Sequence, residues 1–309
     1  MVVIELTSQL GNQMFCYASA KAIALKHNYV FKCYQKALNA KTINDSDKKY
    51  GSGLPQIFNI PNTELLNEEE LKNIENFSVV EEPIFQKLKG SVYQKSIANC
   101  SDNTKIKGYL ISTRYFFDVL EQVRSWFVFP KDIQAQAEEE FNRIKKIAGT
   151  RKICAVHFRV GKDYFQQGYK ISEKYQFLAA NRALSFFENR GGVLFVVFFD
   201  REMREVRNFK KRYLAVDSHN SMIVDMCVVS KCDAAIVSNS TFAIWSALLS
   251  KNPKFKVWRP SKYPIIMGYT PNDCFLESWE SVPARRAYDS SIYMYLRNIA
   301  SKIKHFFDK

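Results

Sequence analysis

The sequence predicts an α/β protein built from two parallel-sheet units, and three observations support this fold class. Strands alternate with helices from residue 152 to residue 258, which is typical of a doubly wound parallel sheet. Residues 2–34 follow the same pattern on a smaller scale. The chain has 309 residues, 47% of them hydrophobic and 25% charged, so it is long enough for two domains and is neither disordered nor fibrous.

In the first half, the order of the predicted elements is strand, tight loop, helix and strand. The strand covers residues 2–6, the loop holds Gly11, the helix covers residues 12–27 and the next strand covers residues 29–34. Residues 40–110 are rich in Asn, Lys and Glu and show no clear period. We expect helices and loops there.

In the second half, a β-rich run at Lys152–Phe158 is the first predicted strand, and residues 173–190 form a helix that stops at Gly191 and Gly192. Val193–Phe199 is a continuous apolar run, typical of a strand with helices on both faces. Asp200 stands where an N-cap would, before a basic helix that ends at Arg212. The remaining predicted elements are strand 213–216, helix 222–230, strand 234–238, helix 241–250 and strand 255–258.

The boundary between the two units is expected near residues 149–151. This gives an N-terminal α/β domain over residues 1–150, a Rossmann-like domain over residues 151–282 and a tail over residues 283–309. The net charge is +14, and the second half carries 26 Lys and Arg against 14 Asp and Glu. A basic half indicates an anionic partner, such as a nucleotide, a nucleic acid or an acidic membrane. A merely soluble surface is the alternative.

The tail places Ile292, Leu296, Ile299 and Ile303 at helical spacing among basic residues. This pattern predicts a basic amphipathic helix that either lies on an anionic membrane or packs on the protein's own core. The first residues have no basic segment and include Glu5, so no signal peptide is expected. We expect a cytoplasmic protein, with peripheral contact to the inner face of the cell membrane if the tail binds lipid.

Seven cysteines contain no CxxC pair, and four histidines are widely separated in the sequence. This spacing argues against a disulfide framework and against a zinc module. We expect reduced, mostly buried cysteines and a chemistry without a metal.

The strongest local motif follows the strand at Lys152–Phe158. His157 and Arg159 are two residues apart and therefore point to the same side of a strand, ahead of a turn with Gly161, Lys162 and Asp163. An imidazole and a guanidinium at this end of a strand suit a phosphate, which arginine contacts with two N–H groups. The alternative is a structural turn in which Arg159 pairs with Asp163.

A second motif places Ser238, Asn239, Ser240 and Thr241 between a strand and a helix. The start of a helix favours an anion, although these residue types are also ordinary N-caps. A third motif, Gly11-Asn12-Gln13, lies in the first strand-to-helix turn, where glycine permits close backbone approach and the amides can bond sugar hydroxyls or a pyrophosphate. It matches neither a dinucleotide fingerprint nor a P-loop.

Together the three motifs resemble those of glycosyltransferase family 11, the α-1,2-fucosyltransferases. Members carry GGLGNQMFQYA, HxRRGDY and SNSTFSWW in that order, and this chain has SQLGNQMFCYA at 8–18, HFRVGKDY at 157–164 and SNSTFAIW at 238–245. The resemblance spans residues 1 to about 282. Its departures are Ser8 and Gln9 for two glycines, Val160 for the second arginine with Lys162 inserted, and Ala243 and Ile244 for Ser and Trp.

The resemblance implies a GT-B fold, in which two Rossmann-like domains face one another across a cleft. It implies inverting transfer of fucose from GDP-β-L-fucose, bound mainly by the second domain, to the 2-hydroxyl of a terminal galactoside in a glycan. No metal or other cofactor is implied. Arg159 would clamp the β-phosphate with support from Lys162 and Gly161, and His157 would orient the donor. Residues 238–241 would hold the pyrophosphate or the ribose.

The general base has two candidates, Asp163 first and Glu5 second, and Asn12 and Gln13 would line the donor–acceptor cleft beside Gly11. A strong base is dispensable if the transition state is oxocarbenium-like. Two other classes stay open: an inactive sugar-binding protein of the same fold, and a nucleic-acid-binding protein, for which no binding motif is found. We expect no nucleic-acid partner.

Overall fold

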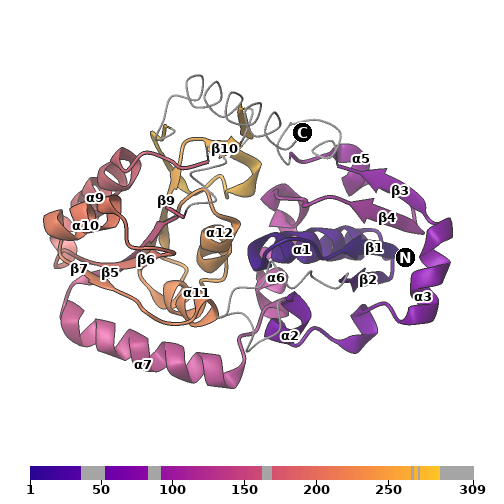
Figure 1. The fold of residues 1–309 in the computed structure, drawn as a ribbon, viewed down its shortest axis with the longest axis horizontal. Coiled ribbons are helices and arrows are strands. Elements are labelled where there is room, and N and C mark those ends of the chain that lie inside the picture. The colour runs from indigo at the N-terminus through magenta and orange to yellow at the C-terminus, as the bar shows by residue number, and fades with distance from the viewer. Residues whose placement is uncertain (36–52, 83–91, 162–168, 266–267, 271, 286–309) are drawn as a thin grey trace, which may run out of the picture.

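The computed structural model describes residues 1–35, 53–82, 92–161, 169–265, 268–270 and 272–285. Within these ranges the chain forms two parallel sheets that lie side by side, with helices packed on their faces (Figure 1). The expected α/β architecture of two Rossmann-like units is confirmed.

The first sheet has four parallel strands in the order β2-β1-β4-β3. Its elements are β1 (Val2–Glu5), α1 (Leu10–Lys26), β2 (Phe31–Tyr34), α2 (Leu54–Phe58), α3 (Glu68–Asn73), β3 (Ser78–Glu81), α5 (Lys95–Ala98), β4 (Thr104–Lys107) and α6 (Leu120–Trp126), with short 3₁₀ turns η3 (Asn62–Glu64), η4 (Ile74–Asn76), η5 (Thr113–Tyr115) and η6 (Phe117–Val119). Val2 and Ile4 of the central strand pack on the α1 side, and Val3 packs on the opposite face with Ile74.

The second sheet has six parallel strands in the order β12-β9-β8-β5-β6-β7. Its elements are α7 (Lys131–Ala148), β5 (Lys152–Phe158), α9 (Lys174–Phe186), η7 (Glu188–Arg190), β6 (Val193–Phe199), α10 (Arg204–Arg212), β7 (Ala215–Asp217), α11 (Met222–Lys231), β8 (Ala234–Ile236), α12 (Thr241–Leu248), β9 (Lys256–Pro260) and β12 (Glu280–Val282), with a hairpin of β10 (Tyr263–Ile265) and β11 (Gly268–Thr270) and the turn η8 (Asn272–Cys274) before the last strand.

Helices cover both faces of the second sheet, as its apolar strands predict. On one face Ala155, Val196 and Ala235 pack against α7, α11 and α12, and on the other Val156 and Val197 pack against α9 and α10. Helix α7 precedes the predicted domain boundary near residue 150, yet it packs on the second sheet. Its residues Glu138 and Arg143 bond Lys231 and the carbonyl of Asp217.

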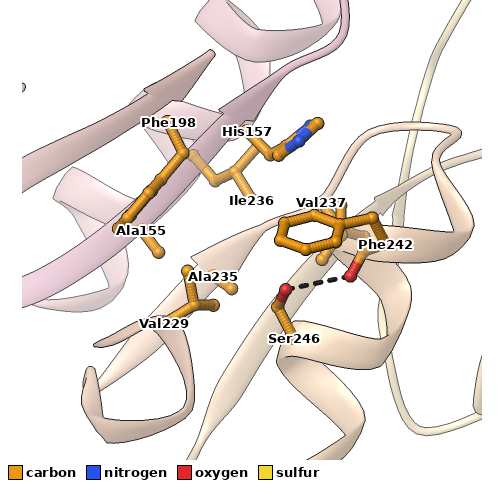
Figure 2. Close-up of a pocket in the computed structure, with 10 residues that line it drawn as sticks. Ala155, His157, Phe198, Val229, Ala235, Ile236, Val237, Phe242 and Ser246 are labelled. Atoms are coloured by element: carbon orange, nitrogen blue, oxygen red, sulfur yellow. Dashed lines mark hydrogen bonds between the residues drawn. The ribbon is translucent and has the colours of Figure 1, made fainter. Parts of the chain in front are cut away.

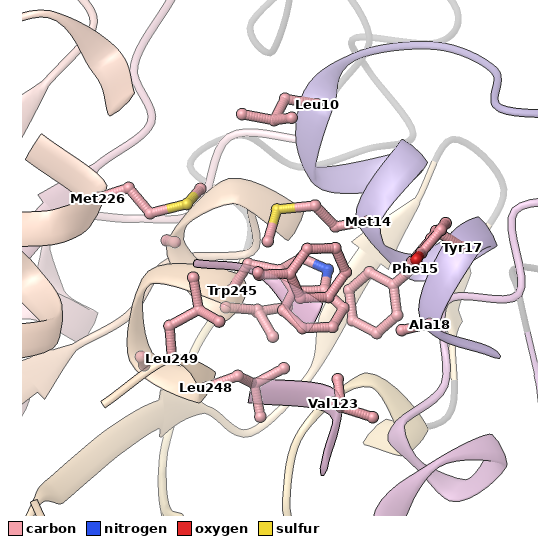
Figure 3. Packing of buried hydrophobic residues seen from close by; sticks show 14 of the residues in the cluster. Leu10, Met14, Phe15, Tyr17, Ala18, Val123, Met226, Trp245, Leu248 and Leu249 are labelled. Carbon is pink, nitrogen blue, oxygen red and sulfur yellow. The ribbon is translucent and has the colours of Figure 1, made fainter. Parts of the chain in front are cut away.

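A continuous hydrophobic core joins the two sheets where α1 meets α12 (Figure 3). The fully buried Trp245 lies at its centre, with ring centroids 5.1 Å from Phe15, 5.5 Å from Phe116 and 5.0 Å from Phe127. Ile244 is fully buried in the same core. The departure from the family's SNSTFSWW at Ile244 therefore changes core packing rather than the wall of a nucleotide pocket.

The seven cysteines are all buried free thiols, and burial raises the pKa of several of them, including that of Cys227 to about 11. Their expected burial is confirmed. In the described ranges no helix is long and apolar enough to cross a bilayer.

Candidate active site

The carboxyl end of β5 carries His157 at the centre of the second sheet, between β8 and β6. Its Nδ1 lies 2.9 Å from the hydroxyl of Ser238, which follows β8. Burial lowers the pKa of His157 to about 4, while Asp200 raises it and Arg159 lowers it further. Burial therefore favours the neutral imidazole in this structure.

Arg159 is held by Asp200, the residue directly after β6. Its Nη1 donates to Oδ2 of Asp200 at 2.5 Å, and the backbone N–H groups of Val160 and Gly161 donate to the same carboxylate at 3.0 and 2.9 Å. One carboxylate thus fixes both the guanidinium and the turn that follows it. Arg159 and Asp200 are 18% and 22% exposed, so the pair is well screened from solvent but open to a ligand at its rim.

The predicted role of Asp200 as an N-cap is wrong. Asp200 does not cap the basic helix, because α10 begins only at Arg204 after an extended Met203. The residues between β6 and α10 turn instead so that the Asp200 carboxylate reaches across to the end of β5. Asp163 and Lys162, the other expected members of this motif, lie outside the described residues.

The turn from Ser238 to Thr241 is bonded mainly inside the protein. Besides the contact of Ser238 with His157, the side chain of Asn239 donates to the carbonyl of Tyr169 at 2.8 Å, and the hydroxyl of Thr241 donates to Oδ1 of Asn12 at 2.8 Å. Ser240 stands at the N-cap position of α12 but makes no side-chain capping bond. Simple capping therefore does not explain these residues, which instead tie the second sheet to its loops and to α1.

Gly11 is required by the contact between the two halves. A Cβ at this position would lie 2.6 Å from the backbone nitrogen of Phe242 and 2.7 Å from the carbonyl carbon of Thr241, both shorter than real contacts. The close approach expected at Gly11 is thus to the first turn of α12. Asn12 bonds to both halves of the chain. Its Oδ1 accepts from Thr241, and its Nδ2 donates to the hydroxyl of Ser8 at 3.1 Å.

Gln13 is a correction to the expected cleft lining. Its side chain is fully buried, its Nε2 donates to the carbonyl of Ser8 at 2.7 Å, and its Oε1 accepts from the N–H of Leu54 at 2.8 Å. Gln13 therefore shapes the first loop and has no surface for a ligand. Ser8 adopts a φ of 67°, the left-handed region that glycine favours, which accounts for the glycine in the family pattern.

Glu5 lies at the carboxyl end of β1, where Tyr34 donates to its Oε2 at 3.3 Å. Burial, together with the negative charge of Glu5, raises the pKa of Tyr34 to about 12. Glu5 thus occupies the ligand-binding edge of the first sheet, as a base acting on an acceptor hydroxyl would.

A narrow pocket opens below His157, between the second sheet and helices α11 and α12 (Figure 2). Among the described residues that line it, only His157 and Ser246 bring polar side chains, and Ser246 donates to the carbonyl of Phe242 at 2.9 Å. This described lining is apolar and offers no set of groups for a diphosphate or a sugar.

Asp225 is a half-buried carboxyl that none of the sequence motifs contains. It lies in the first turns of α11 behind the end of β7, and the hydroxyl of Ser218 donates to its Oδ1 at 2.5 Å. Burial raises the pKa of Asp225 to about 7. The available signal was one acidic residue within the apolar run MIVDMCVV. Within the described ranges, no three metal-ligating side chains come together.

Comparisons with known proteins identify the family and the fold of the chain. The sequence model of glycosyl transferase family 11 matches residues 1–282. An α-1,2-colitosyltransferase from Escherichia coli is 27% identical over 269 residues, which cover 81% of this chain and 87% of that protein. The crystal structure of fucosyltransferase NodZ from Bradyrhizobium aligns with a TM-score of 0.50 at 13% identity, covering 80% of this chain and 93% of that one, and so supports the GT-B-like fold. The chain belongs to glycosyl transferase family 11.

Proposed function

We propose that this glycosyltransferase transfers L-fucose from GDP-β-L-fucose to the 2-hydroxyl of a terminal galactoside, with inversion at the anomeric carbon. Family membership supports the reaction class. The observation that carries the proposal is the Arg159–Asp200 pair at the carboxyl edge of the basic second sheet. Parallel sheets bind their ligands at this edge.

The reaction needs a group that stabilises a leaving diphosphate. The acceptor oxygen forms a bond to C1 of fucose while the bond from C1 to the β-phosphate oxygen breaks, so negative charge grows on GDP. A guanidinium in fixed orientation stabilises that charge without having to reorganise. Asp200 supplies the fixed orientation, which makes Arg159 the candidate β-phosphate ligand.

Neighbouring groups take supporting roles. The neutral His157 orients the turn through Ser238, and the backbone of Gly161 shares the Asp200 carboxylate. In this proposal Lys162 and the side chain of Ser240 contact the sugar nucleotide. Asn239 and Thr241 act indirectly, by bonding to Tyr169 and to Asn12. The proton of the acceptor hydroxyl goes to Glu5 or to Asp163, and no metal takes part.

Colitosyl transfer is the second candidate, because the curated relative is an α-1,2-colitosyltransferase. Colitose is fucose without its 3-hydroxyl, so the same diphosphate site serves both donors. Only the groups that face the 3-position of the sugar would distinguish them.

The test is an assay with GDP-fucose and GDP-colitose on a β-galactoside, with product mass and linkage determined by mass spectrometry and NMR. We expect one donor to give an α-1,2-linked product. GDP binding without any transfer would favour an inactive sugar-binding protein, and binding of nucleic acid without binding of GDP would overturn the proposal. Flotation of the intact chain and of a chain ending at Val282 with anionic liposomes tests the proposed membrane contact of the tail, which from residue 286 lies outside the described residues.

A further inference from the structure

Arg259 is a second guanidinium at the carboxyl edge of the second sheet, in β9. Pairing of Val156 with Ile236 and of Ile236 with Trp258 brings the next residues, His157, Val237 and Arg259, into line across β5, β8 and β9. Aligned residues of parallel strands point to the same face of a sheet. Val257, two residues before Arg259, packs on the α12 face, so Arg259 shares that face with His157.

The hydrogen-bonding groups of Arg259 are mostly unused in the described part of the chain. Among the described residues, its Nε is buried without a hydrogen-bond partner, and its Nη1 reaches only the carbonyl of Pro260 at 3.4 Å. Arg143, Arg159 and Arg182 each pair with a carboxylate, but Arg259 has no such ion pair among the described residues. An arginine has five N–H donors, so a partly buried one in this state is suited to an anion from outside.

The guanidinium is also held in place. Its central carbon lies 5.2 Å from the ring centroid of Phe275, which is buried in the core that joins the two sheets. Burial lowers the pKa of Arg259, which shows that the charge is partly desolvated. Stacking on a ring leaves the edge of a guanidinium open for hydrogen bonds.

The position fits an anion placed over the loop after β8. Neighbouring strands lie about 4.8 Å apart, and β8 lies between β5 and β9. An arginine side chain at the end of β5 or of β9 can therefore reach an anion over the loop after β8. Arg159 approaches from the β5 side with its charge already compensated by Asp200. A bound diphosphate therefore needs a second cation besides Arg159. Arg259 lies on β9, on the other side of β8.

We propose that Arg259 binds the diphosphate of the nucleotide-sugar donor as a second guanidinium, opposite Arg159. The inference rests on the proposed function, since it takes a nucleoside diphosphate sugar as the ligand. It assigns to β9 a donor contact that none of the three sequence motifs contains.

The experiment compares GDP and guanosine as probes, by titration calorimetry on the full chain. Arg259→Gln and Arg259→Met remove the charge, and Met keeps apolar packing on Phe275. Arg182→Gln is the matched control, because Arg182 belongs to α9 and pairs with Glu280 on the face of the sheet opposite to Arg259. We expect both Arg259 variants to bind GDP at least 10-fold more weakly, about 1.4 kcal/mol, with unchanged affinity for guanosine. Arg259→Lys should recover part of the loss.

The outcomes separate the two proposals. If the unmodified protein does not bind GDP, the proposed function fails and the inference fails with it. If it binds GDP and the Arg259 variants bind GDP equally well, only the inference fails. Equal weakening for GDP and guanosine, with a lowered melting temperature, would mean that Arg259 is structural and would also overturn it.

Discussion

Replacement of Asp200 by Asn tests whether the orientation of Arg159 matters for turnover. The carboxylate accepts three hydrogen bonds, two at Oδ2 and one at Oδ1. Asn can keep its oxygen on the Oδ2 side, but its NH₂ group then faces the N–H of Val160, and the ion pair with Arg159 is lost. The lost bond from Val160 went to a charged group and is worth about 2 kcal/mol, and the weaker contact with Arg159 costs about 1 kcal/mol more, so we expect a loss of roughly 3 kcal/mol in stability.

The catalytic effect should exceed what this loss of stability explains. A misplaced donor at a developing oxyanion costs about 10²-fold in kcat. The assay measures kcat and KM for the sugar nucleotide, together with thermal unfolding, at a temperature where the variant is folded. Asp200→Glu, which keeps the charge, should recover part of the stability and little of the turnover, because its carboxylate is displaced.

Glu280→Gln provides the matched control. Glu280 binds Arg182 and Lys256, each at 2.9 Å, in the edge strand β12 on the α9 face of the same sheet. We expect it to lower stability without changing kcat. If Asp200→Asn loses stability but retains the kcat of the unmodified protein, the orientation of Arg159 does not matter for turnover.

Four further predictions follow from the same structure. Arg159→Lys keeps the charge but loses the planar two-pronged contact, so kcat should fall about 10²–10³-fold while the melting temperature changes little. Gly11→Ala should lower the free energy of unfolding by about 1–3 kcal/mol in denaturant titrations, although Ala normally favours a helix, because its Cβ would meet the backbone of Phe242. Because burial raises the pKa of Asp225 to about 7, folding favours its protonated form, and its contribution to stability falls as pH rises from about 4 to about 7. Asp225→Asn should therefore raise the melting temperature more at pH 8 than at pH 5. Turnover should survive EDTA, which a coupled assay without added metal measures.

Each of these predictions has an outcome that contradicts it. Near-normal activity of both Arg159→Lys and Arg159→Ala would remove Arg159 from the site. A melting temperature of Gly11→Ala at or above that of the unmodified protein would mean that the α1–α12 contact is loose. An Asp225→Asn effect that does not change with pH would show that this carboxyl does not titrate differently on folding. Activity lost in EDTA and restored by magnesium or manganese would establish a metal requirement.

Local patterns predicted the elements of the second sheet well. Lys152–Phe158 and Val193–Phe199 are strands with the predicted bounds, because short runs with β-branched and aromatic residues suit parallel strands that helices cover on both faces. The first sheet was less predictable. β3 and β4 were missed because SVVE and TKIK are four residues long and carry charged side chains, so their strand conformation depends on pairing with each other and with β1.

Residue order and local periodicity were enough to predict the fold class, the family and the motif around Arg159. Which groups meet at the site depends on the folded arrangement of the two halves. Asp200 reaches Arg159 across 41 positions, Gly11 touches Phe242 from the other half of the chain, and Arg259 aligns with His157 through β8. Strand order, register and helix contact create these pairs, and they depend on long-range packing that no local pattern encodes.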